Sequence, residues 1–400
     1  MRIKTLVTLT IFWSLTNCMQ PPVKPGPMGS HDKTNADDLT NGNDQTDETP
    51  DPDDKTVVTP PDDKDTTDQM TDKDKDDPLI PVIPPVVTPP KEPDVKDPGT
   101  MGDGDFTIGT SAYSVPEESK CTAYSDETKL KEFEMFSKDS KIYRGQDEYL
   151  KEKGDFSRKG WLYLPRGYTG DKELPFIFVG DGSWSQHKDL MRCVLDNLIK
   201  ARKIPPMAAI FMNPGPLGGG DGPGSQRSFE YDSVTSKFSD WVETEVLPKM
   251  TKDYGVKFTT NPEGRATMGG SSSGAMAFTM AWFHPERYRR VITYSGTYVR
   301  RIKTAENPDG AYEYHSKLIP SSDKKPLRVY IEVGENDNNF KPDTFNNWIT
   351  ANQAMAKAFK DKGYHYKFDF AKGAGHIDGK VYKQTLPGVL EWLWRGYPIP

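Results

Sequence analysis

The chain has 400 residues and a formal net charge of −7, and this charge is unevenly distributed. Residues 19–104 contain no Phe, Trp or Tyr and carry 21 acidic against 8 basic side chains, whereas residues 105–400 carry a net charge of +4. Without a block of Lys and Arg, and without an apolar run of 18 residues, the composition excludes a nucleic-acid binder recognised by charge and a polytopic membrane protein. The aromatic-rich C-terminal part is long enough to bury one large core.

The N-terminus has the order of an export signal. Arg2 and Lys4 precede an apolar stretch over residues 6–15, as in a secretory signal peptide. The following Leu-Thr-Asn-Cys at 15–18 resembles the cleavage box of bacterial lipoproteins, which implies that Cys18 becomes the acylated first residue, carrying chains such as palmitate. We therefore expect residues 1–18 to be a lipoprotein signal and the mature chain to be anchored in the bacterial cell envelope, at the outer membrane or cell surface.

The segment that follows is expected to be a tether. Residues 19–112 are rich in Asp, Thr and Pro, and a segment with so little apolar surface cannot offset the entropy of ordering. Its prolines and like charges favour extended conformations. We expect a disordered linker over 19–112 and a folded domain over 113–400.

Apolar and amphipathic segments alternate through the folded part. The expected elements, in chain order, are strands at 160–165 and 174–179, a helix at 186–202, a strand at 208–212, a helix from 232 to 254, a strand at 266–269, a helix at 274–283, strands at 291–295 and 327–333, a helix at 343–360, a strand at 366–370 and a helix at 380–394. Continuous apolar strands separated by helices predict an α/β fold whose mostly parallel central sheet is covered by helices on both faces. In such a sheet the site lies at the carboxyl ends of the strands, here the loops after Val179, Gly269, Val333 and Phe370.

The loop after the strand at 266–269 carries a G-x-S-x-G motif. Gly270-Ser271-Ser272-Ser273-Gly274 follows a strand and opens a helix, which is the context this motif requires. Glycines allow the sharp turn that exposes the central hydroxyl. The spacing predicts Ser272 as a nucleophile and excludes Ser271 and Ser273.

Two further loops supply a base and an acid. A serine hydroxyl needs a base at hydrogen-bond distance, and His376 is the histidine that follows the last strand. Asp337, in the loop after the strand at 327–333, is expected to orient the imidazole, with Glu335 as the alternative acid. The order Ser272, Asp337, His376 is that of an α/β-hydrolase.

The early loop at 180–184 is expected to stabilise negative charge. Backbone N–H groups of Gly182 or Ser183, together with that of Ser273, would form an oxyanion hole.

Three neighbouring side chains are candidate substrate contacts. Trp184 is expected to form an aromatic wall or to pack in the core. Arg227 and Glu230 would contact substrate or form a structural ion pair. No cluster of His and Cys has metal-ligand spacing and no cofactor fingerprint is present, so we expect neither a metal nor a cofactor.

The remaining two cysteines leave an alternative open. Cys121 and Cys193 would lie in an oxidising compartment and could pair there. We expect buried free thiols, with a disulfide as the alternative.

Taken together, these motifs resemble the Putative esterase family of α/β-hydrolases, which includes enterochelin esterases and feruloyl esterases. The stretches that carry the resemblance are Val179-Gly-Asp-Gly-Ser-Trp184, Phe211-Met-Asn-Pro-Gly215, Arg227-Ser-Phe-Glu-Tyr-Asp232, Met268-Gly-Gly-Ser-Ser-Ser-Gly274, His284-Pro-Glu-Arg-Tyr288, Gly334-Glu-Asn-Asp337 and Gly373-Ala-Gly-His376. The resemblance covers residues 131–400 and implies a serine ester hydrolase that acts through an acyl-enzyme.

The substrate is not fixed by these motifs. Enterochelin esterases carry an extra N-terminal β domain where this chain has its tether, so an external ester such as a feruloyl or acetyl ester is favoured over a siderophore trilactone. The alternatives are a siderophore esterase, an acyltransferase with the same triad, and a non-catalytic surface lipoprotein. The expected partners are an ester substrate and, through the lipid, a membrane; the oligomeric state is left open.

Overall fold

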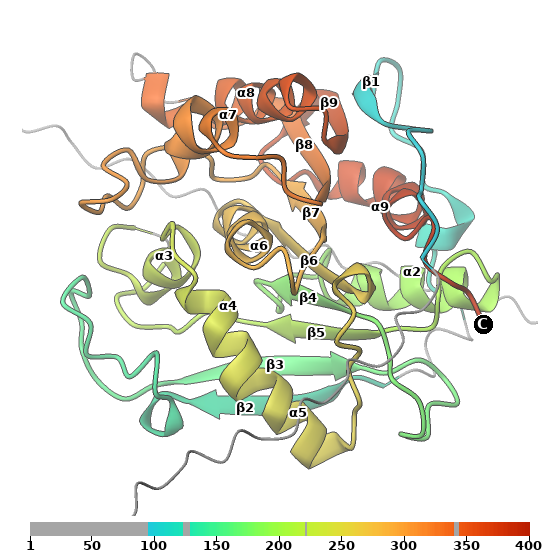
Figure 1. The fold of residues 1–400 in the computed structure, drawn as a ribbon, viewed down its shortest axis with the longest axis horizontal. Helices are drawn as coiled ribbons and strands as arrows, with labels where there is room; N and C mark the ends of the chain where they lie inside the picture. The colour runs from blue at the N-terminus through green and yellow to red at the C-terminus, as the bar shows by residue number, and fades with distance from the viewer. Residues whose placement is uncertain (1–94, 123–128, 221, 340–343) are drawn as a thin grey trace, which may run out of the picture. The chain divides into compact units, whose positions relative to one another are not determined.

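The computed structural model describes residues 95–122, 129–220, 222–339 and 344–400, so the predicted signal, Cys18 and the tether up to residue 94 lie outside the described residues. The described part forms a nine-stranded sheet in the order β1-β9-β8-β7-β6-β4-β5-β3-β2 (Figure 1). The strands are β1 (Gly104–Ile108), β2 (Lys131–Phe136), β3 (Ser157–Tyr163), β4 (Phe176–Gly180), β5 (Ala208–Met212), β6 (Arg265–Gly270), β7 (Arg290–Tyr294), β8 (Arg328–Asn336) and β9 (His365–Gly375). From β1 to β5 in this order neighbours are parallel, and β3 and β2 continue the sheet antiparallel.

Helices cover both faces of this sheet. The main helices are α2 (Asp189–Lys200), α3 (Gln226–Tyr231), α4 (Lys237–Trp241), α5 (Leu247–Tyr254), α6 (Ser272–Phe283), α7 (Ile319–Ser321), α8 (Trp348–Asp361) and α9 (Gly379–Leu393). Figure 1 shows α2 and α9 on one side of the sheet, with α4, α6 and α8 on the other. Each side has its own buried cluster: Met276 and Phe359 belong to the α6 and α8 side, and Leu195 and Leu386 to the α2 and α9 side. The predicted α/β architecture is confirmed.

The folded part begins earlier than expected. Strand β1 lies within residues 19–112, which were predicted as linker, and it pairs parallel with β9 along 104–108. Polar contacts also hold this edge, since the carboxylate of Asp103 accepts hydrogen bonds from His365 Nδ1 at 2.8 Å and Trp392 Nε1 at 2.9 Å. A strand of polar and exposed side chains is stabilised by the ladder of its neighbour, which composition does not reveal.

Two other expectations need correction. Residues 232–254 do not form one regular helix, because α4 and α5 are joined by a π-helical turn, η3 (Val242–Val246). Pro248 follows closely and has no N–H to donate to the helical ladder. Cys121 and Cys193 are not free thiols but form a disulfide, which attaches the segment before β2 to helix α2.

None of the helices in the described ranges combines the length and apolarity needed to cross a membrane.

Candidate active site

Ser271 occupies a sharp turn between β6 and α6. Its backbone has φ 57° and ψ −126°, a region that a non-glycine residue adopts at a cost of about 1–3 kcal/mol. The turn is held by neighbours, since Ser271 N–H donates to Tyr294 O at 2.9 Å and Thr297 N–H donates to Ser271 O at 3.0 Å. This turn places the Ser271 hydroxyl at the carboxyl edge of the sheet.

The residues two before and two after Ser271 must be small for this turn to close. A Cβ on Gly269 would lie 2.2 Å from the backbone of Ser273, so the close crossing of strand and helix requires glycine there. Ser273 takes the second position and makes two hydrogen bonds, with Oγ accepting from Gly270 N–H at 3.0 Å and donating to Gly270 O at 2.8 Å. Its extra volume is accommodated because Gly180 of β4 lies opposite, where a Cβ would approach Ser273 Cβ to 2.6 Å.

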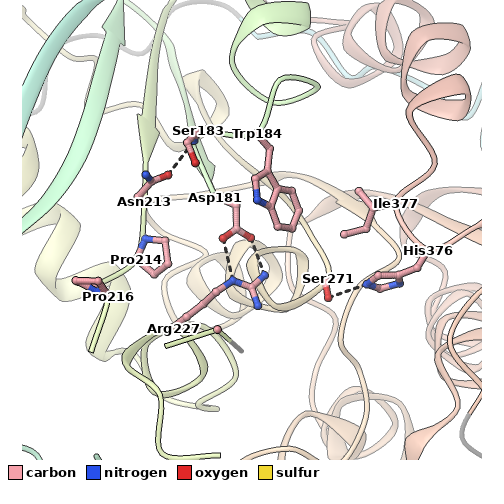
Figure 2. A pocket seen from close by; sticks show the side chains of 12 residues that line it. Asp181, Ser183, Trp184, Asn213, Pro214, Pro216, Arg227, Ser271, His376 and Ile377 are labelled. Atoms are coloured by element: carbon pink, nitrogen blue, oxygen red, sulfur yellow. Dashed lines mark hydrogen bonds and ion pairs between the residues drawn. The ribbon is translucent and has the colours of Figure 1, made fainter. Parts of the chain in front are cut away.

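Ser271, His376 and Asp337 are joined by hydrogen bonds. His376 Nε2 lies 2.9 Å from Ser271 Oγ, and His376 Nδ1 lies 2.6 Å from Asp337 Oδ1 (Figure 2 shows the first of these). The Asp337 side chain is fully buried, while the imidazole is 24% exposed. A buried carboxylate on Nδ1 fixes the tautomer in which Nε2 accepts a proton.

The expectation that Ser272 meets His376 is therefore wrong, because Ser271 holds that position. Ser272 is the first residue of α6, and its buried side chain lies near the carboxyl group of Asp232 instead. The error came from centring the motif on Gly270 and Gly274. The informative signal was the end of the strand, because the serine that faces His376 is the residue between the last strand residue and the first helical one.

Glu335, the alternative acid, points to another partner. Its carboxylate accepts a hydrogen bond from Lys372 Nζ at 2.7 Å and one from Gly373 N–H at 2.9 Å. The Lys372 hydrogen bond lowers the pKa of Glu335, and Asp337 alone of the two contacts His376.

The N–H groups expected to form the oxyanion hole are already bonded within the fold. Gly182 N–H donates to Met212 O at 3.0 Å, and Ser183 N–H donates to Asn213 Oδ1 at 2.8 Å. These two amides are therefore unavailable in this structure, contrary to expectation. The third expected amide, that of Ser273, lies one residue too far, because the residue that follows Ser271 is Ser272.

A cavity of about 600 Å³ opens beside Ser271 and His376. Its lining is Asp181, Ser183, Trp184, Asn213, Pro214, Gly215, Pro216, Gly220, Arg227, Ser271, His376 and Ile377. Figure 2 shows Trp184 between the Asp181–Arg227 pair and Ile377, so that it forms part of the wall. The guanidinium of Arg227 contacts Asp181 through Nε at 2.9 Å and Nη2 at 2.8 Å. This bidentate pair brings one positive and one negative charge to the cavity.

Glu230, the other candidate contact, is not at the cavity. It is buried in an ion pair with Arg158 and also accepts a hydrogen bond from Gln226 Nε2 at 2.7 Å. Burial raises its pKa. Glu230 on α3 is therefore buried in the core. Of the two roles expected for it, substrate contact or a structural ion pair, the structure shows the ion pair, with Arg158 as the partner.

A buried histidine, His187, lies behind the cavity wall. His187 packs against Trp184 with ring centroids 5.1 Å apart, and its nitrogens contact Gly180 O at 2.7 Å and Tyr382 Oη at 3.0 Å. Burial lowers the pKa of His187, so the ring is neutral near pH 7. It supports the Trp184 wall and does not reach the Ser271 hydroxyl by any hydrogen bond found in the described ranges.

Within the described residues, no group of three or more His, Cys, Asp or Glu side chains is arranged so that it could hold a metal ion.

A serine, a histidine and a buried carboxylate that meet at the carboxyl edge of a mostly parallel sheet define an α/β-hydrolase. Residues 155–393 match the family described as Putative esterase, which is more than half of the chain. The chain belongs to this family.

The fold is shared with a solved esterase. The CE1 ferulic acid esterase of the anaerobic fungus Anaeromyces mucronatus aligns at 13% identity with a TM-score of 0.50, over 71% of this chain and 97% of that chain. The enterochelin esterase of Shigella flexneri aligns at 19% identity with a TM-score of 0.49, over 70% of this chain and 62% of that one. A Shigella flexneri enterobactin esterase aligns at 20% identity with a TM-score of 0.47, over 67% of this chain and 60% of that chain. This chain therefore spans about three fifths of that protein's length. No curated protein matches the chain in sequence.

Proposed function

We propose that the chain is a serine esterase in which Ser271 is the nucleophile, His376 the general base and acid, and Asp337 the group that orients His376. The observation that carries this proposal is the pair of contacts made by one imidazole, 2.9 Å to Ser271 Oγ and 2.6 Å to Asp337 Oδ1. The backbone strain at Ser271 supports the same assignment, since strained residues cluster at sites where geometry matters.

The reaction would run in two halves. Ser271 Oγ attacks the ester carbonyl carbon while its proton moves to His376 Nε2, and the carbonyl oxygen becomes an oxyanion. His376 returns this proton to the alcohol oxygen as the C–O bond breaks, which leaves an acyl-enzyme on Ser271. Water then attacks the acyl carbon while His376 takes one of its protons. The bond between this carbon and Ser271 Oγ breaks, His376 returns the proton to Ser271 Oγ, and the acid is released.

The N–H of Ser272 is our candidate for stabilising the oxyanion. It belongs to the first residue of α6, where a backbone N–H has no intrahelical acceptor and lies at the positive end of the helix dipole. An N–H aimed at the developing charge is typically worth about 3 kcal/mol in the transition state.

The proposed substrate is an external ester with a neutral acyl group, such as a feruloyl or acetyl ester. The cavity walls include the apolar surfaces of Trp184, Pro214, Pro216 and Ile377, which suit an aromatic or methyl group. Arg227 is neutralised by Asp181, so this guanidinium offers little net attraction to a polyanionic siderophore.

Export and lipid attachment at Cys18 belong to the same proposal. The Cys121–Cys193 disulfide supports an oxidising compartment, because such bonds persist outside the cytosol. Incorporation of a palmitate analogue in the producing cell, lost in Cys18→Ala, is the expected result; labelling that persists in Cys18→Ala would contradict it.

The test of the nucleophile compares two adjacent serines. A fluorophosphonate probe and a panel of aryl, acetyl and feruloyl esters should report activity in the wild type and none in Ser271→Ala. Ser272→Ala is the matched control, because it removes the neighbouring hydroxyl and keeps the backbone N–H; it should still react with the probe. Labelling of Ser271→Ala at the wild-type rate would refute the assignment.

A further inference from the structure

Thr297 is a second neighbour of the Ser271 hydroxyl. This fully buried residue follows strand β7, and its Oγ1 lies 3.3 Å from Ser271 Oγ. Its backbone N–H donates to Ser271 O at 3.0 Å, so Thr297 contacts both the main chain and the side chain of the strained serine. Among the residues that the structure describes, the Ser271 hydroxyl therefore has two hydrogen-bond partners, Thr297 Oγ1 and His376 Nε2.

Trp348 donates a hydrogen bond to Thr297. Its Nε1 lies 3.3 Å from Thr297 Oγ1, and an indole N–H can only donate. Thr297 Oγ1 is therefore the acceptor in this bond, which leaves its own proton free to be donated to Ser271 Oγ. When Ser271 Oγ accepts from Thr297, its one proton is directed to His376 Nε2.

The fold holds Trp348 in this place from several sides. Trp348 is buried at the start of α8. Its backbone N–H donates a hydrogen bond to the carbonyl oxygen of Asn338, the residue after Asp337, at 3.0 Å. Asn352, one turn further along α8, donates through Nδ2 to Trp348 O at 2.8 Å and to Gly296 O at 2.9 Å, which fixes the helix to the loop of Thr297. The Trp348 ring also meets the His376 ring edge to face, with centroids 6.0 Å apart.

We propose that Thr297 is a positioning residue for catalysis: with Trp348 it forms a one-directional hydrogen-bond chain that orients the proton of Ser271 toward His376. The chain runs from Trp348 Nε1 through Thr297 Oγ1, Ser271 Oγ and His376 to Asp337. This inference rests on the proposed nucleophile and deepens it. Neither Thr297 nor Trp348 contacts the substrate carbonyl; both act through Ser271.

Without the Thr297 hydroxyl, the serine would sample other rotamers, and fewer molecules would have the proton on the line to His376. Loss of this hydroxyl should lower kcat and leave KM unchanged, because Thr297 does not line the cavity. The net worth of one hydrogen bond corresponds to a loss of about 3- to 10-fold in rate.

The experiment uses three variants of the full chain with p-nitrophenyl acetate and a fluorophosphonate probe. Thr297→Val keeps the shape and removes the hydroxyl, and it should lower kcat and the rate of Ser271 labelling about 3- to 10-fold with KM within about twofold. Thr297→Ser should restore both rates. Trp348→Phe keeps an aromatic ring beside His376 and removes the N–H, and it should lower kcat in the same direction.

The double variant Thr297→Val/Trp348→Phe should be no slower than Thr297→Val, because both changes break the same chain. Wild-type labelling of Ser271 together with unchanged kcat in Thr297→Val, or fully multiplicative losses in the double variant, would overturn the chain and leave the nucleophile standing. If Thr297→Val is poorly folded by its thermal transition, the comparison of Trp348→Phe with Thr297→Ser decides, and equal rates in the two overturn the proposal. A wild type that does not label at Ser271 would instead refute the proposed function.

Discussion

The contact between Gly180 and Ser273 predicts an energetic coupling between strand β4 and the turn at Ser271. A Cβ added at Gly180 would lie 2.6 Å from Ser273 Cβ and 2.5 Å from Met276 Cε. Gly180→Ala must therefore displace Ser273, and overpacking of this kind costs about 1–3 kcal/mol. Ser273→Gly loses two hydrogen bonds to Gly270, at 3.0 and 2.8 Å, and adds a flexible residue to α6, for a cost of about 2–3 kcal/mol.

The two costs should not add. In Ser273→Gly the space opposite Gly180 is empty, and the remaining contact is with the flexible end of Met276, which can rotate away. We expect the double variant to be at least about 1 kcal/mol more stable than the sum of the single changes predicts.

Equilibrium unfolding in urea, followed by tryptophan fluorescence, measures all four corners of this cycle. Gly388→Ala is the control, because an added Cβ there meets no heavy atom within 4 Å and should show no coupling to Ser273→Gly. If Gly180→Ala costs the same in both backgrounds to within about 0.5 kcal/mol, the explanation of why this turn tolerates serine in place of glycine is refuted.

Three further outcomes are expected. Asp337→Asn should lower kcat about 10⁴-fold in ester hydrolysis through the wrong imidazole tautomer, and Glu335→Gln, whose carboxylate serves a surface lysine, should keep activity; the reverse ranking would contradict the geometry. Replacing Cys121 and Cys193 by Ser should reduce the free energy of unfolding by about 2–4 kcal/mol, as should reductant on the wild type, and equal stability with and without reductant would argue against the disulfide. Burial and nearby carboxylates hold the pKa of Glu332 well above 4.5, so the folded state keeps a proton that the unfolded state releases as pH rises, and the stability it contributes falls over that interval. The free energy of unfolding of Glu332→Gln should therefore match that of the wild type at pH 4.5 and exceed it at higher pH, by at most about 1.4 kcal/mol per pH unit. A difference in the free energy of unfolding that does not change with pH would show that Glu332 ionises normally.

The fold class and the place of the site follow from local features of the amino-acid sequence. Apolar strands alternating with amphipathic helices require a parallel sheet with two covered faces, and the carboxyl ends of parallel strands meet at one edge. The loops that carry Ser271, Asp337 and His376 were therefore identified from local patterns alone, and the preference for Asp337 over Glu335 agrees with the observed hydrogen bonds.

Long-range packing selects which of three adjacent serines faces His376. In Gly269-Gly-Ser-Ser-Ser-Gly274 several registers satisfy a pattern of glycines and serine, and a one-residue shift changes the direction of the side chain completely. The register is set by contacts from distant segments, namely the space left at Gly180 and the hydrogen bonds from Thr297 to Ser271. The pairing of β1 with β9, the partners of the Gly182 and Ser183 amides and the Cys121–Cys193 bond were decided in the same way, because each depends on what long-range packing brings near, which no local pattern encodes.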